Sequence, residues 1–434
     1  MNIYYILYIT VSTFIFLILC PVLLFYALIS GRYTRGINER LGWIPSPIAA
    51  SLTGSPRIWI HAVSLGEVRV AQAIINELRQ MIPSCSIIVS TATAHGRNLA
   101  MDLFGKEVKI IYAPLDILLF VWMSLNTIRP DALIFLEAEI WPAWISEAKR
   151  RGIKIAIING RISPRSFGRY LRFKPLFGHI LSKVDAFSMI TEDDKRRITA
   201  MGASPSRIIV NGNAKFDLLS RQAEPSREDE TRRLFNLKNN NDLLIAGSTH
   251  TGEEEMVIEA YKRIVREFPE TILFIAPRHI ERSKEIAAIL EKNKLEFQFR
   301  SGLKGGAERC KQVLIIDSFG ELFNLYSIGT VIFCGGSLVP LGGQNPMEPA
   351  IWAKPILYGP SMEDFLDAKA LLEENSAGIE VSGSVMLAEK VLMLLRDRSL
   401  LKEYGLRARD SVYKNRKAAE RHARVITNIL TGTY

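Results

Sequence analysis

The chain alternates short apolar runs with polar, helix-forming segments, and this alternation occurs twice. Six runs of strand length lie in the first half, between residues 57 and 211: IWIHAVS, SIIVSTAT, VKIIYAPL, ALIFLEAEI, IKIAIING and AFSMIT. The pattern restarts near Asp242 with LLIAGS, TILFIAP, QVLIIDS, TVIFCGG and PILYG. Strands that alternate with helices form parallel sheets that helices cover on both faces. We therefore predict an α/β protein with two doubly wound, Rossmann-like domains.

The length of 434 residues is too great for one ordinary domain and fits this division. We expect a first domain over residues 31–215, a polar linker over 216–241 and a second domain over 242–434. The last part of the second domain, from Leu387 onward, is helical in pattern and basic, and a solvated face is its default interpretation.

An uncharged segment of 27 residues, 3–29, precedes the first domain. It exceeds the roughly 20 residues that cross a bilayer. It is longer than the apolar part of a cleaved signal peptide, about 7–15 residues, and no basic segment precedes it. Arg32, Arg35 and Arg40 follow directly, which by the positive-inside rule predicts that the rest of the chain is cytoplasmic. The sequence thus predicts a single-pass membrane anchor.

The net charge of +10 indicates anionic partners, which include nucleic acid, a phosphorylated substrate or a membrane surface. Between Lys149 and Lys183 the chain has ten Lys or Arg residues, interleaved with aromatic ones, and no acid. Beside a membrane anchor, such a segment favours lipid headgroups or lipid phosphates over nucleic acid. A solvated basic face without a specific partner is the alternative.

Polar side chains follow several strands of the first predicted sheet. Substrates of such sheets bind at the carboxyl ends of the strands. We therefore take these groups as candidates for one site: Ser64, Gly66 and Glu67, then Thr91, Thr93 and Gly96, then Glu137 and Glu139, and finally Asn159 and Arg161.

Glu39 is the only carboxylate between Met1 and Glu67, and it lies about ten residues after the apolar segment. An acid in that place can accept a proton from a hydroxyl that a lipid headgroup presents, as general-base catalysis requires. The alternative is an ion pair with Arg35 or Arg40 on a helix surface.

The second predicted domain contains a glycine-rich turn between a buried strand and a helix, VIFCGGSLVPLGGQNPMEPAIW over residues 331–352. Asn345 and Glu348 follow the glycines and can hold a ribose diol, although a plain turn with a surface glutamate is the alternative. Arg278 and His279 follow the second strand, where a guanidinium can meet a phosphate, and a surface ion pair is the alternative there. The patterns GxxxxGK[ST], GxGxxG after the first strand and HExxH do not occur, which argues against ATP hydrolysis, a nicotinamide cofactor and a zincin mechanism.

Eight blocks, in order along nearly the whole chain, resemble the 3-deoxy-D-manno-octulosonic acid (Kdo) transferases of lipopolysaccharide biosynthesis. The blocks are NERLGW, HAVSLGEV, FLEAEIWP, INGRISPRSF, GNAKFD, AGSTHTGEEE, APRHIER and GGSLVPLGGQNPMEPA. The resemblance implies a GT-B glycosyltransferase fold, in which two Rossmann-like domains face a cleft. It also implies that the chain transfers Kdo from CMP-Kdo to the lipid A precursor lipid IVA, with the acceptor on the first domain and the nucleotide sugar on the second.

The resemblance further implies that Glu39 is the general base. The residues that we expect on the donor (CMP) side are Lys215, Ser248, Arg278, His279, Gly335, Gly336, Ser337, Asn345 and Glu348. The residues that we expect on the acceptor side are Ser64, Gly66, Glu67, Glu139, Arg161 and Arg165.

A leaving group that already carries a phosphate charge can be stabilised by fixed cations and amide dipoles alone. Because the chain also has no clear DxD motif, we predict an inverting reaction that needs neither a metal nor a cofactor. The partners would be the donor, the lipid acceptor and the inner membrane, without nucleic acid. The alternatives are a membrane-tethered transferase that uses another nucleotide sugar and a non-catalytic lipid-binding scaffold.

Overall fold

The structure is a computed structural model. It describes residues 2–30, 36–105, 107–224, 226–238, 241–303, 308–414 and 416–433, without the side chains of residues 23–30 and 221. Arg32 and Arg35 lie outside the described residues. The chain forms two compact units. The first unit contains residues 1–218 and 417–434, and the second unit contains residues 219–416.

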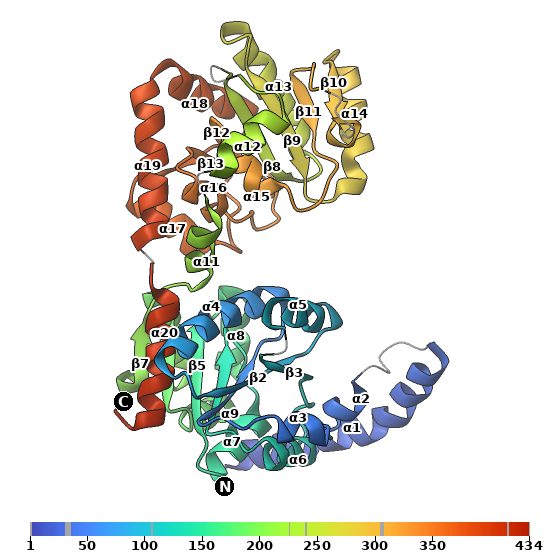
Figure 1. The fold of residues 1–434 in the computed structure, drawn as a ribbon, viewed down its shortest axis with the longest axis vertical. Helices are drawn as coiled ribbons and strands as arrows, with labels where there is room; N and C mark the ends of the chain where they lie inside the picture. The colour runs from blue at the N-terminus through green and yellow to red at the C-terminus, as the bar shows by residue number, and fades with distance from the viewer. Residues whose placement is uncertain are drawn as a thin grey trace. The chain divides into compact units, whose positions relative to one another are not determined.

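The first unit is built on a parallel sheet of seven strands in the order β3-β2-β1-β4-β5-β6-β7 (Figure 1). The strands are β1 Arg57–His61, β2 Ser86–Thr91, β3 Lys109–Tyr112, β4 Ala132–Leu136, β5 Lys154–Gly160, β6 Ala186–Met189 and β7 Ile208–Val210. Side chains of β1 alternate between the two faces, because Ile58 and Ile60 pack in one core and Trp59 in the other. Burial on both faces explains why these strands are continuously apolar.

Helices cover both faces of this sheet. Buried residues of α4 Leu65–Met81, α5 Ala94–Phe104 and α20 Ala418–Thr431 share one core. The other core takes residues from α1 Ile3–Ser30, α6 Leu118–Ile128, α7 Pro142–Arg150, α9 Lys174–Leu181 and α10 Glu192–Met201. The remaining helices are α2 Ile37–Arg40, α3 Ser46–Ala50 and α8 Pro164–Arg172, and α11 Lys215–Gln222 runs from the first unit into the second.

The second unit repeats the design with a parallel sheet in the order β10-β11-β9-β8-β12-β13-β14. Its strands are β8 Leu243–Thr249, β9 Ile272–Pro277, β10 Phe297–Phe299, β11 Val313–Ile315, β12 Val331–Cys334, β13 Ile356–Tyr358 and β14 Gly378–Glu380. Its helices are α12 Ser226–Leu234, α13 Glu253–Glu267, α14 Ser283–Lys292, α15 Leu322–Ile328, α16 Met347–Ile351, α17 Leu366–Glu374, α18 Ser384–Arg396 and α19 Arg398–Lys414. The two Rossmann-like sheets confirm the predicted fold class.

The predicted domain boundaries differ from the observed ones. The second predicted domain runs to residue 434, but α20 belongs to the first unit. The predicted linker 216–241 contains all of α12 and most of α11. Ala419, Ala423 and Ile426 of α20 are buried against the sheet, and His422 lies 2.7 Å from Ser188 Oγ through Nδ1. This apolar face of α20 attaches the C-terminal segment to the first unit, although the segment is rich in basic residues.

Candidate active site

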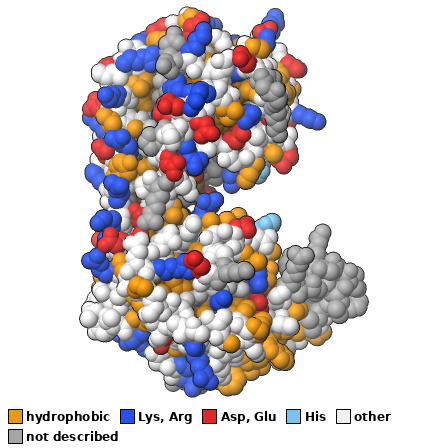
Figure 2. Space-filling model, viewed as in Figure 1, with side chains coloured by type: hydrophobic (Ala, Val, Ile, Leu, Met, Phe, Trp, Pro, Cys, Tyr) orange, Lys and Arg blue, Asp and Glu red, His pale blue; other side chains and the backbone are white. Residues whose placement is uncertain are grey.

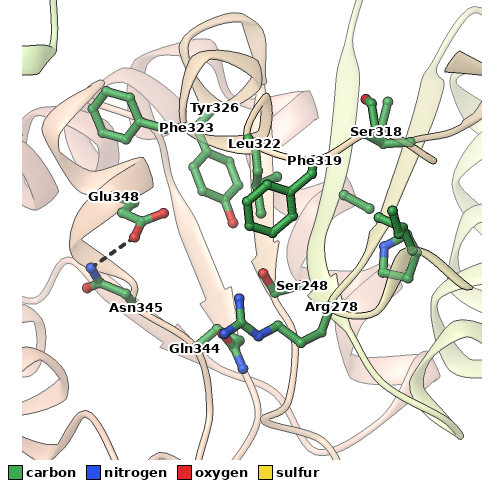
Figure 3. A pocket seen from close by; sticks show the side chains of 15 residues that line it. Ser248, Arg278, Ser318, Phe319, Leu322, Phe323, Tyr326, Gln344, Asn345 and Glu348 are labelled. Atoms are coloured by element: carbon green, nitrogen blue, oxygen red, sulfur yellow. Dashed lines mark hydrogen bonds between the residues drawn. The ribbon is translucent and has the colours of Figure 1, made fainter. Parts of the chain in front are cut away.

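The second unit has a cavity of about 250 Å³ at the carboxyl ends of its central strands (Figure 3). Its apolar walls come from Ala276, Pro277, Ile280, Ile316, Phe319, Leu322, Phe323 and Tyr326. Its polar groups come from Ser248, Arg278, Ser318, Gln344, Asn345 and Glu348. Four donor-side residues predicted from the sequence thus line one cavity: Ser248, Arg278, Asn345 and Glu348.

Asn345 and Glu348 meet at the start of α16. Asn345 Nδ2 donates to Glu348 Oε1 at 3.2 Å, and Asn345 Oδ1 accepts from Met347 N at 3.1 Å. The second bond fixes the turn that precedes α16, so that both side chains face the cavity (Figure 3). Two oxygen-bearing side chains held in this way can bind vicinal hydroxyl groups.

Arg278 is the only Lys or Arg that lines this cavity within the described ranges. Its neighbour Arg282 pairs with Glu254 instead, because its guanidinium donates to both carboxylate oxygens of Glu254, at 2.6 and 3.2 Å. His279 does not line the cavity, and its ring centroid lies 5.9 Å from that of His250. Burial, followed by the charge of His279, lowers the pKa of His250.

The backbone amides of the glycine-rich turn, whose residues the resemblance places on the donor side, already have a partner. Glu253, fully buried at the start of α13, accepts from Gly336 N at 2.6 Å and from His250 N at 2.9 Å through Oε2. Its Oε1 accepts from Ser337 N at 3.0 Å and from Leu338 N at 2.9 Å. The backbone amides of Gly336 and Ser337 are therefore paired with a carboxylate of the chain, and the place of these two residues on the donor side stays a prediction.

Gly335 is required for close packing. A Cβ on Gly335 would lie 2.5 Å from Ser248 O, a distance that no side chain tolerates, and its amide donates to Gly247 O at 2.8 Å. Ser248 itself has a φ of 54°, which is a costly backbone conformation for a residue with a side chain. The end of β8 and the turn after β12 are thus held against one another at the edge of the cavity.

In the first unit, Glu39 lies in α2 and is 7% exposed. Its Oε2 accepts from Arg97 Nη1 at 2.8 Å and from Tyr112 N at 2.6 Å. Arg40 instead donates from Nη2 to Ala92 O at 2.7 Å. The guanidinium groups of Arg97 and Arg40 lie 4.7 and 4.5 Å from the centroid of the Tyr112 ring.

Arg97, the partner of Glu39, was not predicted from the sequence. The predicted partners were Arg35, which lies outside the described residues, and Arg40, whose guanidinium faces a carbonyl. The available signal was the position of Arg97 directly after Thr93 and Gly96, at the carboxyl end of the second predicted strand.

Ser64 and Glu67 together cap the start of α4, with the Glu67 carboxylate bonded to the residue before the N-cap. Glu67 N donates to Ser64 Oγ at 3.3 Å, and Glu67 Oε2 accepts from Val63 N at 2.6 Å. Burial, followed by the charge of Glu137, raises the pKa of Glu67 to about 7. A Cβ on Gly66 would lie 3.5 Å from Lys215 Nζ, an ordinary contact.

Lys215 pairs with Glu137 at the strand ends of the first unit, since Lys215 Nζ lies 2.6 Å from Glu137 Oε1. It does not line the cavity of the second unit. Trp141 Nε1 donates to Glu139 Oε2, and burial raises the pKa of Glu139. Glu137 has a φ of 56° and Asn159 one of 53°, so two neighbouring strands end in strained residues, as is common at functional sites.

The two predicted acceptor-side arginines lie after β5. Arg161 is half-buried and its charge reaches Asp194, while Arg165 is exposed in the first turn of α8. Among the described residues, no group of three or more His, Cys, Asp or Glu side chains is arranged to hold a metal ion.

Residues 35–218 match a family model described as 3-deoxy-D-manno-octulosonic-acid transferase (kdotransferase). The chain is 32% identical over 396 residues to the 3-deoxy-D-manno-octulosonic acid transferase of Haemophilus influenzae, covering 90% of this chain and 91% of the relative. It is 30% identical over 368 residues to the enzyme of the same name from Chlamydophila psittaci, covering 84% and 83%.

Among solved structures, a glycosyltransferase from Rickettsia africae is similar with a TM-score of 0.60 and 16% identity, covering 87% of this chain and 99% of that one. A putative UDP-N-acetylglucosamine 2-epimerase from Listeria monocytogenes has a TM-score of 0.64 and 14% identity, covering 87% and 98%. At these identities the likeness concerns the fold, which is of the two-domain GT-B type.

Proposed function

The chain belongs to the family of 3-deoxy-D-manno-octulosonic acid (Kdo) transferases, and from this premise we propose that it transfers Kdo from CMP-Kdo to the lipid A precursor lipid IVA. It is a glycosyltransferase, and the observation that carries the finer proposal is the convergence of Arg278, Asn345 and Glu348 on one cavity. A cation for one phosphate, two polar groups for a ribose and apolar walls for a base match a nucleoside monophosphate.

In the proposed reaction, Glu39 takes the proton from the acceptor hydroxyl as its oxygen attacks the anomeric carbon of Kdo. The bond from that carbon to the phosphate oxygen breaks, and CMP leaves with the electron pair. Attack from the face opposite CMP inverts the anomeric centre. The bonds from Arg97 and the Tyr112 amide hold the Glu39 carboxylate in one orientation, which supports its use as a positioned base.

Arg278 would neutralise the charge on the departing CMP. This stabilisation acts where charge develops and uses only a side chain of the protein, so metal independence stays a prediction of the proposed mechanism. The sequence-based assignments of Lys215 and His279 to the donor stay predictions as well, because neither residue is part of the lining of the cavity.

The acceptor is a lipid, so the protein must work at a membrane. Residues 3–22 of α1 are long and apolar enough for a membrane segment by length and composition. We propose that α1 anchors the enzyme at the inner membrane with both units in the cytoplasm, and that nucleic acid is not a partner.

The test is transfer of Kdo from CMP-Kdo to a tetraacylated lipid A precursor in the presence of EDTA, with the products weighed by mass spectrometry. We expect a product one or more Kdo residues heavier than the acceptor. In parallel, CMP should protect the chain from heat and UDP should not. Protection by UDP alone would favour a different nucleotide sugar, and neither protection nor transfer would favour the lipid-binding scaffold.

A further inference from the structure

One stripe of α1 packs against the first unit along the first half of the helix. The inward residues, at spacings of three or four, are Tyr5, Tyr8, Ile9, Ser12 and Phe16. Residues at this spacing lie on one face of a helix. Of the polar side chains on this stripe, Tyr8 bonds to the rest of the first unit, whereas Ser12 Oγ donates to Ile9 O within α1 itself.

Three contacts fix this packing at separate points. Asn2 Nδ2 donates to Pro175 O, beside the start of α9, at 3.3 Å. Tyr8 Oη donates to Asp116 Oδ2 at 2.6 Å. The rings of Phe16 and Phe120 meet edge to face with centroids 5.1 Å apart. At about 1.5 Å per residue, these contacts secure roughly 20 Å of helix.

The contact with Asp116 is built into the core of the first unit. Asp116 Oδ1 accepts from Ala143 N and from Trp144 N, both at 3.1 Å, at the first turn of α7. A carboxylate there satisfies amides that lack a partner within the helix. Burial raises the pKa of Asp116 to about 6, which indicates that burying the charged carboxylate costs free energy. The hydrogen bond from the Tyr8 hydroxyl satisfies this buried carboxylate and is therefore not merely a surface contact.

The opposite side of α1 is exposed and apolar. Its exposed residues include Ile3, Leu7, Val11, Phe14, Ile15, Leu17, Ile18 and Val22. The apolar surface continues over α6 through Leu118, Leu119 and Trp122, and Figure 2 shows apolar side chains gathered along this edge of the first unit. A surface of this extent marks an interaction site.

A crossing of the bilayer conflicts with these contacts. Residues 3–22 would span about 30 Å, which puts Asn2 on the side opposite to residue 22. Asn2 contacts Pro175, however, whose neighbours Arg172 and Lys174 are exposed. Those charges would have to cross with the helix, at several kcal/mol each.

The chain that follows the apolar segment is also attached to the first unit. Gly36, after the undescribed residues 31–35, packs so closely on Tyr112 that a Cβ would lie 1.8 Å from its ring. Both ends of the apolar segment are thus attached to one folded unit, on one side of any membrane.

We infer that α1 does not cross the membrane but lies in its plane, with the stripe of Tyr5, Tyr8 and Phe16 on the protein and the opposite face in the cytoplasmic leaflet. The partner is an anionic lipid leaflet, because exposed Arg172 and Lys174 flank exposed Leu171 and Phe173 beside the start of the helix. This arrangement replaces the predicted single crossing and holds whether or not the chain transfers Kdo.

The experiment places an uncharged tag with a protease site before Met1 and, in a second protein, after Tyr434, in otherwise unchanged chains. In inside-out inner-membrane vesicles we expect the protease to remove both tags, and in intact spheroplasts neither. The C-terminal tag reports the orientation of the vesicles. Cleavage of the N-terminal tag from the outer side, or only after detergent, overturns the in-plane arrangement.

A second measurement tests the lipid face through flotation of purified protein with anionic vesicles. Leu7→Glu with Phe14→Glu should lower the bound fraction about 10-fold or more, because both side chains would be charged within the leaflet. The matched control, Leu7→Met with Phe14→Leu, should bind as the wild type does. Tryptophan fluorescence checks that both variants are folded, and undiminished flotation of the charged variant contradicts the inference.

Discussion

Arg97 Nη1 lies 2.8 Å from Glu39 Oε2, which joins the start of α5 to the short helix that follows the apolar segment. Because the proposed base is held in this way, we expect Glu39→Gln to lower the transfer rate by about 10² to 10⁴-fold, the usual contribution of a general base. The measurement is Kdo transfer followed by mass spectrometry. Exposed Asp102 provides the control, since Asp102→Asn should retain full activity. A Glu39→Gln enzyme near the wild-type rate would remove Glu39 from the mechanism.

Arg97 is expected to act as a positioning residue. Its charged hydrogen bond is worth about 1.5–3 kcal/mol, so Arg97→Ala should lower kcat by roughly 10- to 100-fold while KM for CMP-Kdo changes little. Arg97→Lys keeps the charge and should recover part of the loss. Heat protection by CMP should be unchanged in both variants, because the cavity lies in the other unit. An equal change in KM, or lost CMP protection, would indicate a general structural effect instead.

The parallel strands were predictable because burial on both faces makes them continuously apolar. The three strands that the sequence analysis missed, β7, β10 and β14, are three residues long, stand at the sheet edges and are only partly buried. Their apolar signal is weak for that physical reason. The cavity residues Arg278, Asn345 and Glu348 were predictable because turns after parallel strands meet at one edge.

The partners of the site residues were not predictable. Glu253 satisfies amides about 80 residues further along the chain, and Arg97 pairs with Glu39 across 58 residues. Such pairs depend on how the layers pack. The sequence of a glycine-rich turn is the same whether its backbone amides bind a ligand anion or a carboxylate of the chain.

Glu253 is expected to stabilise the second unit. Glu253→Ala would leave four amides without an acceptor, two of them buried and two part-buried, and should lower the free energy of unfolding by at least about 3 kcal/mol. Glu253→Gln, which keeps one oxygen acceptor, should lose less. Hydrogen exchange provides the local measurement, because the amides of Gly336, Ser337 and Leu338 should lose protection in the Ala variant. Neighbouring exposed Glu255 gives the control, and equal exchange in Glu253→Ala and Glu255→Ala would refute the role.

The stability of the first unit should depend on pH through Glu67. The pKa of Glu67 is about 7 in the folded protein against 4.5 as the ordinary value. Between these values the folded state keeps a proton that the unfolded chain has released, so this group lowers the free energy of unfolding as pH rises from 4.5 to about 7. Glu67→Gln should remove that part of the pH dependence. Urea unfolding of wild type and variant at about pH 5 and about pH 7.5, followed by tryptophan fluorescence, measures it.

Fluorescence suits this comparison because five of the six tryptophans lie in the first unit: Trp43, Trp59, Trp122, Trp141 and Trp144. The variant should gain stability relative to the wild type at the higher pH. Asp102→Asn should follow the wild type at both values. A constant difference between Glu67→Gln and wild type across the range would show that Glu67 does not titrate there.

Phe319 is expected to stack on the nucleobase of the donor. It is 88% exposed although it is a large apolar side chain, and its ring borders the cavity across from Asn345 and Glu348 (Figure 3). An aromatic ring so placed can cover a base while the polar pair holds the ribose. Stacking of a base on an aromatic side chain is worth about 1–3 kcal/mol, so Phe319→Ala should weaken CMP binding by roughly 5- to 150-fold.

Calorimetric titration with CMP measures this loss, and Phe319→Tyr, which keeps a flat ring, should bind nearly as the wild type does. Because the side chain is exposed, the melting temperature without ligand should not change in either variant. Arg278→Gln should weaken CMP binding as well but leave the affinity for cytidine nearly unchanged, since cytidine lacks the phosphate. If Phe319→Ala binds CMP like the wild type, the base lies elsewhere in the cavity and the exposed ring needs another explanation.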